Sequence, residues 1–285
     1  MAMAAAAAAG AAIVRGRKGP PRFWGAPGRS WQPLAAAFSS RPGGAPGGSG
    51  PPPIQAAPLA DNLLCQMDQR DTWDRFYAAK GDGAAGPRHF EWFFGYREIA
   101  GLLLTHLQGL PPGPARVLDV GCGTSGLGLG LLRDCPRRLR VSCLDFSPPA
   151  VATLRRLLRE SPPPRHPLSR LRCHVADATR LAGAFPPRSF HLVLDKGTCD
   201  ALLRGPRGPG RAGGLVAACL ALLRPEGRLL QFSDEDPDAR APFLERAGGV
   251  PVAVQEVGCF GGIRYYAYIL GPRAPDPPAV CGADG

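Results

Sequence analysis

A glycine-rich turn that directly follows a short apolar run is the feature of this sequence best suited to chemistry. Residues 116–123 read Arg-Val-Leu-Asp-Val-Gly-Cys-Gly, so β-forming residues surround Asp119 and lead into Gly121, Cys122 and Gly123. Glycine lets the backbone turn sharply and approach a ligand where a Cβ atom would collide with it. This pattern predicts a buried parallel strand that feeds a nucleotide-binding loop.

A second acidic residue follows at the distance expected for a nucleotide site. Asp145 ends the apolar run Arg140-Val-Ser-Cys-Leu-Asp and is followed by Phe146. The interval from Asp119 fits a strand–helix–strand unit of about 30 residues, in which such an acid binds the hydroxyls of a ribose. The alternative interpretation of Asp145 is a helix-capping aspartate at the surface.

The position of the first acid bears on the type of nucleotide. An NAD site would use a similar layout, so Gly-x-Gly by itself is weakly specific. Asp119, however, precedes the first glycine by two residues, where its carboxylate can meet a cationic amino-acid ligand. This placement argues against NAD.

The run Leu118-Asp-Val-Gly-Cys-Gly resembles motif I of the class I S-adenosylmethionine-dependent methyltransferases, whose pattern is acid-x-Gly-x-Gly-x-Gly. Ser125 occupies the third glycine position, a mild departure because a small residue still fits. The resemblance implies that S-adenosylmethionine is the cofactor, S-adenosylhomocysteine the product, and no metal is needed. Its expected binding residues are Asp119, Gly121, Cys122, Gly123, Asp145, Phe146, Asp177, Ala178 and Asp195. Asp177 would frame the adenine, although a turn residue is the alternative.

A second motif, Leu194-Asp-Lys-Gly-Thr-Cys-Asp-Ala201, resembles the methyltransferases that modify lysines of folded proteins, including those that act on translation elongation factor one-alpha. The Asn/Asp-Pro-Pro-aromatic motif of adenine- and glutamine-N methyltransferases is absent. Cys199 is interpreted as a packing residue, since cytosine-C5 enzymes need a Pro-Cys nucleophile.

Further segments resemble the lysine methyltransferases of citrate synthase. They are 90–96, 231–238 and 260–266, and the resemblance covers about 71–270. It implies trimethylation of a citrate synthase lysine in the mitochondrial matrix.

Aromatic and acidic residues near these motifs are the candidates for holding the acceptor lysine. A lysine has a pKa near 10.4 and must lose a proton before it is methylated, which apolar surroundings and the sulfonium cation both favour. Trp92, Phe93, Phe94 and Tyr96 could line a lysine channel and contact a methylammonium group by cation–π interaction. The alternative is that they pack the N-terminal helix. Acids that could orient the ammonium group are Asp195, Asp200, Asp234 and Glu235. The 234–238 cluster could instead be a solvated loop or a weak cation site.

Alternating strand and helix patterns predict a mostly parallel sheet with helices on both faces. The expected strands are 116–121, 140–145, 171–176, 190–195, 227–233, 252–257 and 263–270. The expected helices are 90–108, 125–134 with Thr124 or Ser125 as cap, 148–160 with Ser147 as cap, and 214–224. The last two strands predict an antiparallel hairpin at one edge. The expectation is the seven-stranded, Rossmann-like α/β fold of class I methyltransferases with an antiparallel C-terminal edge strand, and a ligand site beyond the strand ends.

Composition predicts the organisation of the rest of the chain. Of the net charge of +11 in 285 residues, much lies in residues 1–60, which contain six basic residues and no acidic one. This composition favours a mitochondrial transit peptide at residues 1–40. The alternative is a disordered tail that carries no targeting signal. A Pro/Gly-rich linker is expected over 41–60, an aromatic, helical extension over the active site at 61–112, the methyltransferase domain at 113–271, and a flexible tail at 272–285.

The remaining composition bears on partners. The nine cysteines contain no Cys-x-x-Cys pair and favour free thiols over a disulfide framework or a zinc site. No uninterrupted run of eighteen apolar residues predicts a membrane span. A protein substrate is expected, with no membrane or nucleic acid as partner. Three alternatives stay open: a methyltransferase of the same fold for another mitochondrial protein or a small molecule, one for RNA with an arginine strip at 155–172 as the contact, and a non-catalytic scaffold.

Overall fold

The computed structural model describes residues 66–81 and 89–271. These residues belong to one unit of the chain, Pro33–Gly285. The expected transit peptide, the linker and the tail lie outside the described residues.

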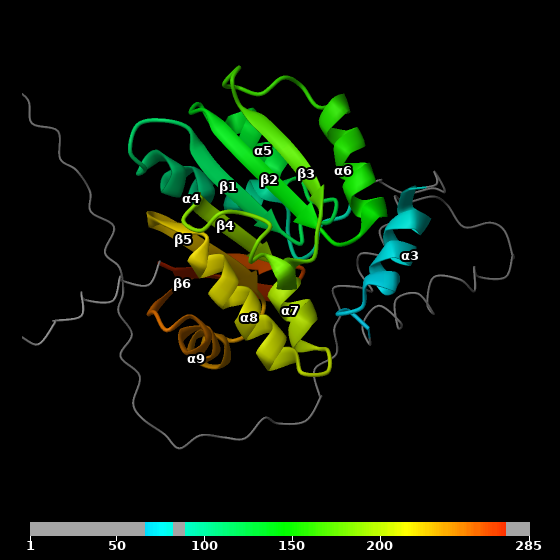
Figure 1. Cartoon of the computed structure of the whole chain (residues 1–285), viewed down its shortest axis with the longest axis vertical. Coiled ribbons are helices and arrows are strands. Elements are labelled where there is room, and N and C mark those ends of the chain that lie inside the picture. The colour runs from blue at the N-terminus through cyan, green and yellow to red at the C-terminus, as the bar shows by residue number, and fades with distance from the viewer. Residues whose placement is uncertain (1–65, 82–88, 272–285) are drawn as a thin grey trace, which may run out of the picture. The chain divides into compact units, whose positions relative to one another are not determined.

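The strands form one sheet with the order β3-β2-β1-β4-β5-β7-β6 (Figure 1). β1 to β5 are parallel, and β7 runs antiparallel between β5 and β6. The predicted fold class and the antiparallel C-terminal hairpin are confirmed, with β6 as the outermost strand. The strands are β1 (Ala115–Val120), β2 (Leu139–Asp145), β3 (Arg170–Val175), β4 (Phe190–Lys196), β5 (Leu223–Ser233), β6 (Val252–Phe260) and β7 (Ile263–Leu270).

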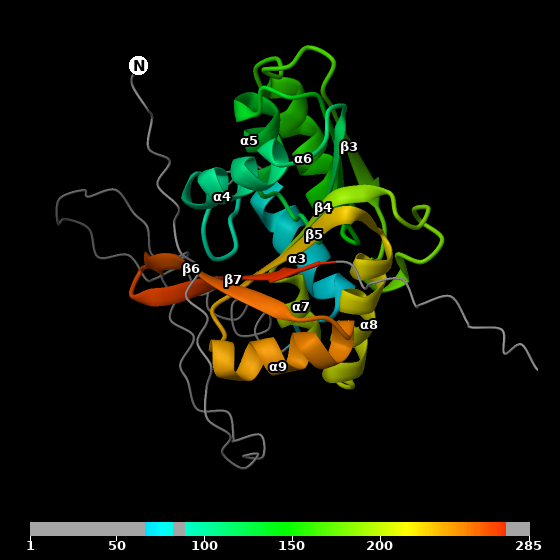
Figure 2. The same cartoon turned by 90° about the vertical axis from the view of Figure 1, so that its left-hand side faces the viewer.

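Helices cover both faces, because side chains alternate between two cores along each strand. Val117 and Val141 face a core built with α4 (Tyr96–Gln108), α5 (Leu127–Asp134) and α6 (Pro148–Glu160). Leu118 and Leu144 face a core built with α7 (Thr198–Leu203), α8 (Gly208–Ala221) and α9 (Pro237–Gly248). Figure 2 shows α8 and α9 on one side of the sheet and α4 and α5 on the other. The N-terminal α3 (Arg70–Gly81) packs against α6 through Phe76, Tyr77 and Ala150.

Several helices differ from the sequence expectation, and α7 has no counterpart among the expected ones. The helix predicted from residue 90 begins at Tyr96, with Gly95 as its N-cap, and Phe93 before it has a left-handed φ of +68°. α8 begins at Gly208, six positions before the expected start, despite the glycine and proline content of its first turn. α9 was not expected, and it begins inside the 234–238 segment, because Asp236 caps it by accepting from the amide of Asp238 at 2.9 Å and Pro237 suits its first turn. Residues 234–236 before it are not helical, and Glu235 and Asp236 are exposed.

Candidate active site

Two adjoining pockets lie where the parallel strands end. The larger has a volume of about 700 Å³ and is lined by residues that include Asp145, Phe146, Asp177 and Ala178. The smaller, of about 300 Å³, is lined by residues that include Asp119 and the 121–123 turn. Both linings share Tyr77, Trp92, Gly121 and Lys196. The pockets are therefore neighbours with a common wall.

The glycine pair has the conformation that the sequence pattern requires. Gly121 and Gly123 have φ values of +61° and +52°, in the left-handed region that favours glycine. A Cβ atom on Gly121 would overlap the Thr198 hydroxyl, and one on Gly123 would overlap the Tyr77 hydroxyl. The side chains of Thr198 and Tyr77 therefore pack against the turn and leave no room for a side chain at either glycine.

Asp145 connects this turn to the end of β2. Its Oδ2 accepts from the amide of Gly123 at 2.9 Å, and its Oδ1 accepts from the amide of Ser147 at 2.8 Å. Burial raises the pKa of Asp145 to about 6, although both amides favour the carboxylate. The alternative of a helix-capping aspartate at the surface is wrong, because Asp145 is buried, lines the larger pocket and leaves the N-cap position of α6 to Ser147.

Asp119 is the least satisfied acid of the site. Its side chain is buried, its Oδ2 has no hydrogen-bond partner among the described residues, and it lines the smaller pocket. Burial raises its pKa to about 7, with Lys196 opposing and neighbouring carboxylates adding to the rise. A buried acceptor without a donor is costly. A ligand that brings an ammonium group to Oδ2 would remove this cost.

Glu91, which was not a candidate from the sequence, binds the residues that directly follow the glycine turn. Oε1 of Glu91 accepts from the amide of Gly126 at 2.7 Å, and its Oε2 accepts from the Ser125 hydroxyl at 2.8 Å. The same Oε2 lies 3.0 Å from Nζ of Lys196. Burial raises the pKa of Glu91, but Lys196, His89 and the amide outweigh it and lower the pKa to about 2. Glu91 is therefore a carboxylate throughout the neutral range.

His89, which is partly exposed, lies next to Glu91 and binds it. Its Nδ1 lies 2.7 Å from the carbonyl oxygen of Thr124, and its Nε2 lies 2.9 Å from Oε1 of Glu91. Both partners are acceptors, so both ring nitrogens bond well only when each carries a proton. The hydrogen bond to Glu91 accordingly raises the pKa of His89.

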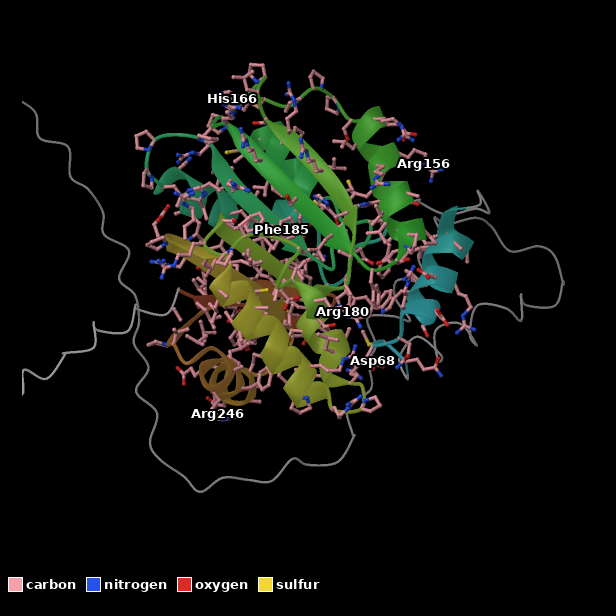
Figure 3. The ribbon with its side chains drawn as sticks, viewed as in Figure 1. Asp68, Arg156, His166, Arg180, Phe185 and Arg246 are labelled. Atoms are coloured by element: carbon pink, nitrogen blue, oxygen red, sulfur yellow. The ribbon has the colours of Figure 1, made fainter. Side chains whose placement is uncertain are left out.

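The outer wall of the larger pocket comes from α3 and the turn before it. Met67, Asp68, Trp73 and Tyr77 all line the pocket. Asp68 forms an ion pair with Arg211 of α8 at 2.7 Å, which ties this wall to the body of the domain. Figure 3 shows Asp68 beside Arg180, below the ends of the central strands. Both residues also line a shallower depression next to the larger pocket.

Comparison with known proteins decides the family. A family model described as a methyltransferase domain matches residues 117–227. The Homo sapiens protein named citrate synthase-lysine N-methyltransferase CSKMT, mitochondrial, is 47% identical over 222 residues, covering 75% of this chain and 90% of that protein. The Danio rerio protein of the same name is 42% identical over 225 residues, covering 76% and 88%. The Bos taurus EEF1A lysine methyltransferase 4 is 30% identical over 207 residues, covering 68% and 72%.

This chain belongs to the citrate synthase-lysine N-methyltransferase family. The pockets suit the cofactor of such an enzyme. The partnerless Asp119 oxygen fits the ammonium group of a methionine moiety, and the Asp145 carboxylate in the adjoining pocket fits a ribose diol. Asp177 lines the larger pocket beside Ala178, while its Oδ1 accepts from both the amide and the hydroxyl of Thr179 at 2.8 Å.

The four aromatic candidates occupy different places. Trp92 lines both pockets and packs on Gly197, where a Cβ atom would overlap the indole. The ring centroid of Phe93 lies 5.2 Å from that of Tyr265, and the ring centroid of Phe94 lies 5.7 Å from that of Phe232. Tyr96 packs over Gly130 of α5 and is not among the residues lining either pocket.

The four acidic candidates are also separated. Asp195 is buried, and its Oδ1 accepts from the amides of Thr198 and Cys199 at the start of α7; burial raises its pKa to about 7. Asp200 forms a buried ion pair with Arg240 of α9 and accepts from the Ser233 hydroxyl at 2.6 Å. Neither acid is among the lining residues of the two pockets. Asp234 is half-buried, with its pKa raised by burial to about 6, and Glu235 is exposed.

Lys196 and Tyr77, which line both pockets, were not selected from the sequence, nor was Glu91, which pairs with Lys196. Lys196 stands inside the Asp-Lys-Gly-Thr motif and Glu91 inside the 90–96 aromatic segment, so both motifs were recognised without assigning these side chains a role.

Two general findings concern other kinds of site. Within residues 66–81 and 89–271, no group of three or more His, Cys, Asp or Glu side chains is arranged to hold a metal ion. None of the helices in the same ranges combines the length and the apolar character needed to cross a membrane.

Proposed function

We propose that this protein is the lysine methyltransferase of citrate synthase, transferring methyl groups from S-adenosylmethionine to one lysine in the mitochondrial matrix. The observation that carries the proposal is the 47% identity to the human relative over 90% of that protein's length. The relatives at 42–47% identity are named mitochondrial, and the acid-free composition of residues 1–40 supports import into the matrix.

Different residues of the chain would bind different parts of the cofactor. Asp119 would accept from its ammonium group, the 121–123 backbone would border its methionine part, and Asp145 would accept from its ribose hydroxyls. Phe146, Asp177 and Ala178 would surround the adenine, as their place in the larger pocket supports. Asp195 would act indirectly, by fixing the start of α7 beneath the pocket. The bound cofactor supplies a sulfonium methyl group that is already activated for transfer to an amine.

The wall shared by the two pockets is the best position for the acceptor lysine. Trp92 and Tyr77 provide an aromatic, water-excluding surface there, which favours the neutral amine and tolerates a methylammonium product. Lys196 stands at the same wall in its ion pair with Glu91 and so fixes the backbone of Trp92 there. Phe93, Asp234 and Glu235 lie outside both linings and would contact the protein substrate around the lysine, whereas Phe94 is buried in the core and would support the fold. Tyr96 and Asp200 would support the fold.

Mass spectrometry of citrate synthase tests the proposal. The full chain and S-adenosylmethionine are incubated with purified citrate synthase, beside an Asp119→Asn variant and an Asp238→Asn control at an exposed position. The proposal expects mass gains of whole methyl groups on one lysine with the wild type and the control, and none with Asp119→Asn. No gain from a wild-type chain that binds S-adenosylhomocysteine would overturn the substrate assignment.

A further inference from the structure

Half of one face of the sheet has no helix over it. α7, α8 and α9 pack on the core of Leu118, Val193 and Leu229, whereas α5 and α6, which contact β2 and β3, belong to the opposite core. Between β3 and β4 the chain forms only the single turn η1 (Ala178–Arg180) and an irregular segment. Figure 3 shows His166 and Phe185 at the two ends of the uncovered area, with no helix across β2 and β3 between them.

Arginine occupies the uncovered positions. Arg116 pairs in register with Arg140, and Arg140 with Arg170, so three arginines stand side by side on adjacent strands. Their sequence neighbours Val117, Val141 and Leu171 face the opposite core, which places the arginines on the uncovered face. Arg172, two residues after Arg170, shares this face. We call these four residues the arginine patch.

The charge of the patch is not neutralised within the described residues. Arg140, Arg170 and Arg172 are exposed, and Arg116 is half-buried over the Phe190 ring at 5.7 Å. No carboxylate among residues 66–81 and 89–271 forms an ion pair with any of the four. Adjacent strands lie about 4.8 Å apart, and like charges directly opposite one another destabilise a sheet. An anionic partner would relieve this repulsion.

We propose that the arginine patch binds a short acidic segment of another protein. The chain itself does not offer such a segment at its N-terminus, since residues 1–60 contain no acid. Guanidinium groups bind carboxylates through paired hydrogen bonds. Among the face-sharing positions of β1 to β3, His174 is the one aromatic ring, and it packs edge-on against Phe185 with ring centroids 5.7 Å apart. Proteins that bind single-stranded nucleic acid stack successive bases on several such rings. The patch is also only three strands wide, which suits a few carboxylates better than a track of about six to ten phosphates.

Fluorescence anisotropy with charged probes tests the proposal. The full chain is titrated with a labelled peptide of glutamate and serine, with labelled oligouridylate, and with phosphatidylglycerol vesicles. The test variant is Arg140→Glu/Arg172→Glu, and the matched control is Arg97→Glu/Arg246→Glu, which makes the same charge change at exposed positions of α4 and α9. Arg140→Gln/Arg172→Gln serves if the reversed charges impair folding.

The proposal expects the peptide to bind in a salt-dependent manner, with Kd raised at least about tenfold in the patch variant and nearly unchanged in the control. Equal weakening in both variants would overturn it, because binding would then follow net charge alone. Tighter binding of the RNA or the vesicles than of the peptide, lost in the patch variant, would also overturn it by assigning the patch to another class of partner. Methylation of citrate synthase is measured separately and does not decide the outcome.

Discussion

Glu91 and Lys196, which are 105 positions apart in the sequence, form an ion pair of 3.0 Å beside the glycine turn. The side chains are 18% and 4% exposed, so the pair is largely withdrawn from water. Glu91 also bonds the Ser125 hydroxyl and the Gly126 amide, and Lys196 also donates to the Trp92 carbonyl oxygen. The pair therefore joins the segment before β1, the turn after β1 and the end of β4 into one wall.

Removal of either partner should destabilise the domain. We expect Glu91→Gln and Lys196→Met each to lower the free energy of unfolding by about 2–3 kcal/mol. Glu91→Gln leaves the buried Lys196 ammonium without its carboxylate, and Lys196→Met leaves the Glu91 carboxylate without its cation. The double variant should lose less than the sum of the two. Urea denaturation measures this, with Arg264→Met of the exposed Arg264–Glu256 pair as the control that should change little. Strictly additive losses would contradict the coupling.

Cofactor affinity should depend on pH near neutrality. The pKa of Asp119 is raised to about 7 by burial, and the cofactor's ammonium group needs the carboxylate. We expect the Kd for S-adenosylhomocysteine to be about tenfold higher at about pH 6 than at about pH 8, with proton release on binding at about pH 6. Calorimetry in two buffers of different ionisation enthalpy measures both. A Kd that does not change over this range would show that Asp119 does not titrate in the site.

Asp119 should also reduce the stability of the cofactor-free protein. The folded chain keeps its proton up to about pH 7, whereas an unfolded chain releases it near pH 4. Deprotonation in this window favours unfolding, and above it the native state carries the full cost of a buried carboxylate. Asp119→Asn should therefore raise Tm at about pH 8, with a smaller gain towards about pH 4. Thermal scans beside Asp238→Asn test this, and an Asp119→Asn variant with an unchanged or lower Tm at the higher pH would contradict it.

The contact between Tyr77 and Gly123 gives a rescue experiment. Gly123→Ala should abolish S-adenosylhomocysteine binding, because the added Cβ overlaps the Tyr77 hydroxyl at a φ of +52°. Tyr77→Phe removes that hydroxyl and should by itself bind normally. In the combined variant we expect partial recovery of binding, limited by about 1 kcal/mol of left-handed strain in alanine. If the combined variant binds no better than Gly123→Ala, the collision is not the cause of the loss.

Most of the fold was predictable from the sequence, because its signals are local. The runs that end at Val120, Asp145 and Lys196 are rich in apolar, β-forming residues, as strands of a parallel sheet are, and each is followed by a turn or helix start. α9 and the first turn of α8 were missed since they contain glycine and proline, which usually mark loops. Asp236 caps α9, and the two helices pack against each other.

The site was predictable only where chemistry and spacing coincide. The glycines and the acids at strand ends stand in a recognisable order, and the structure places Asp119 and Asp145 at adjoining pockets. The roles of Glu91 and Asp200 depend on partners more than thirty positions away, Lys196 and Arg240, which no local pattern reveals. Whether a carboxylate faces a pocket or a buried arginine is decided by tertiary packing.

The central claim is that the partnerless oxygen of Asp119 anchors the cofactor. Calorimetric titration of the full chain with S-adenosylhomocysteine at about pH 8, where the carboxylate is ionised, tests it most directly when wild type and Asp119→Asn are compared. We predict saturable binding by the wild type and a Kd at least about a hundredfold higher for the variant, in line with the loss of a buried charge-assisted bond. Equal affinities in a folded variant would contradict the account.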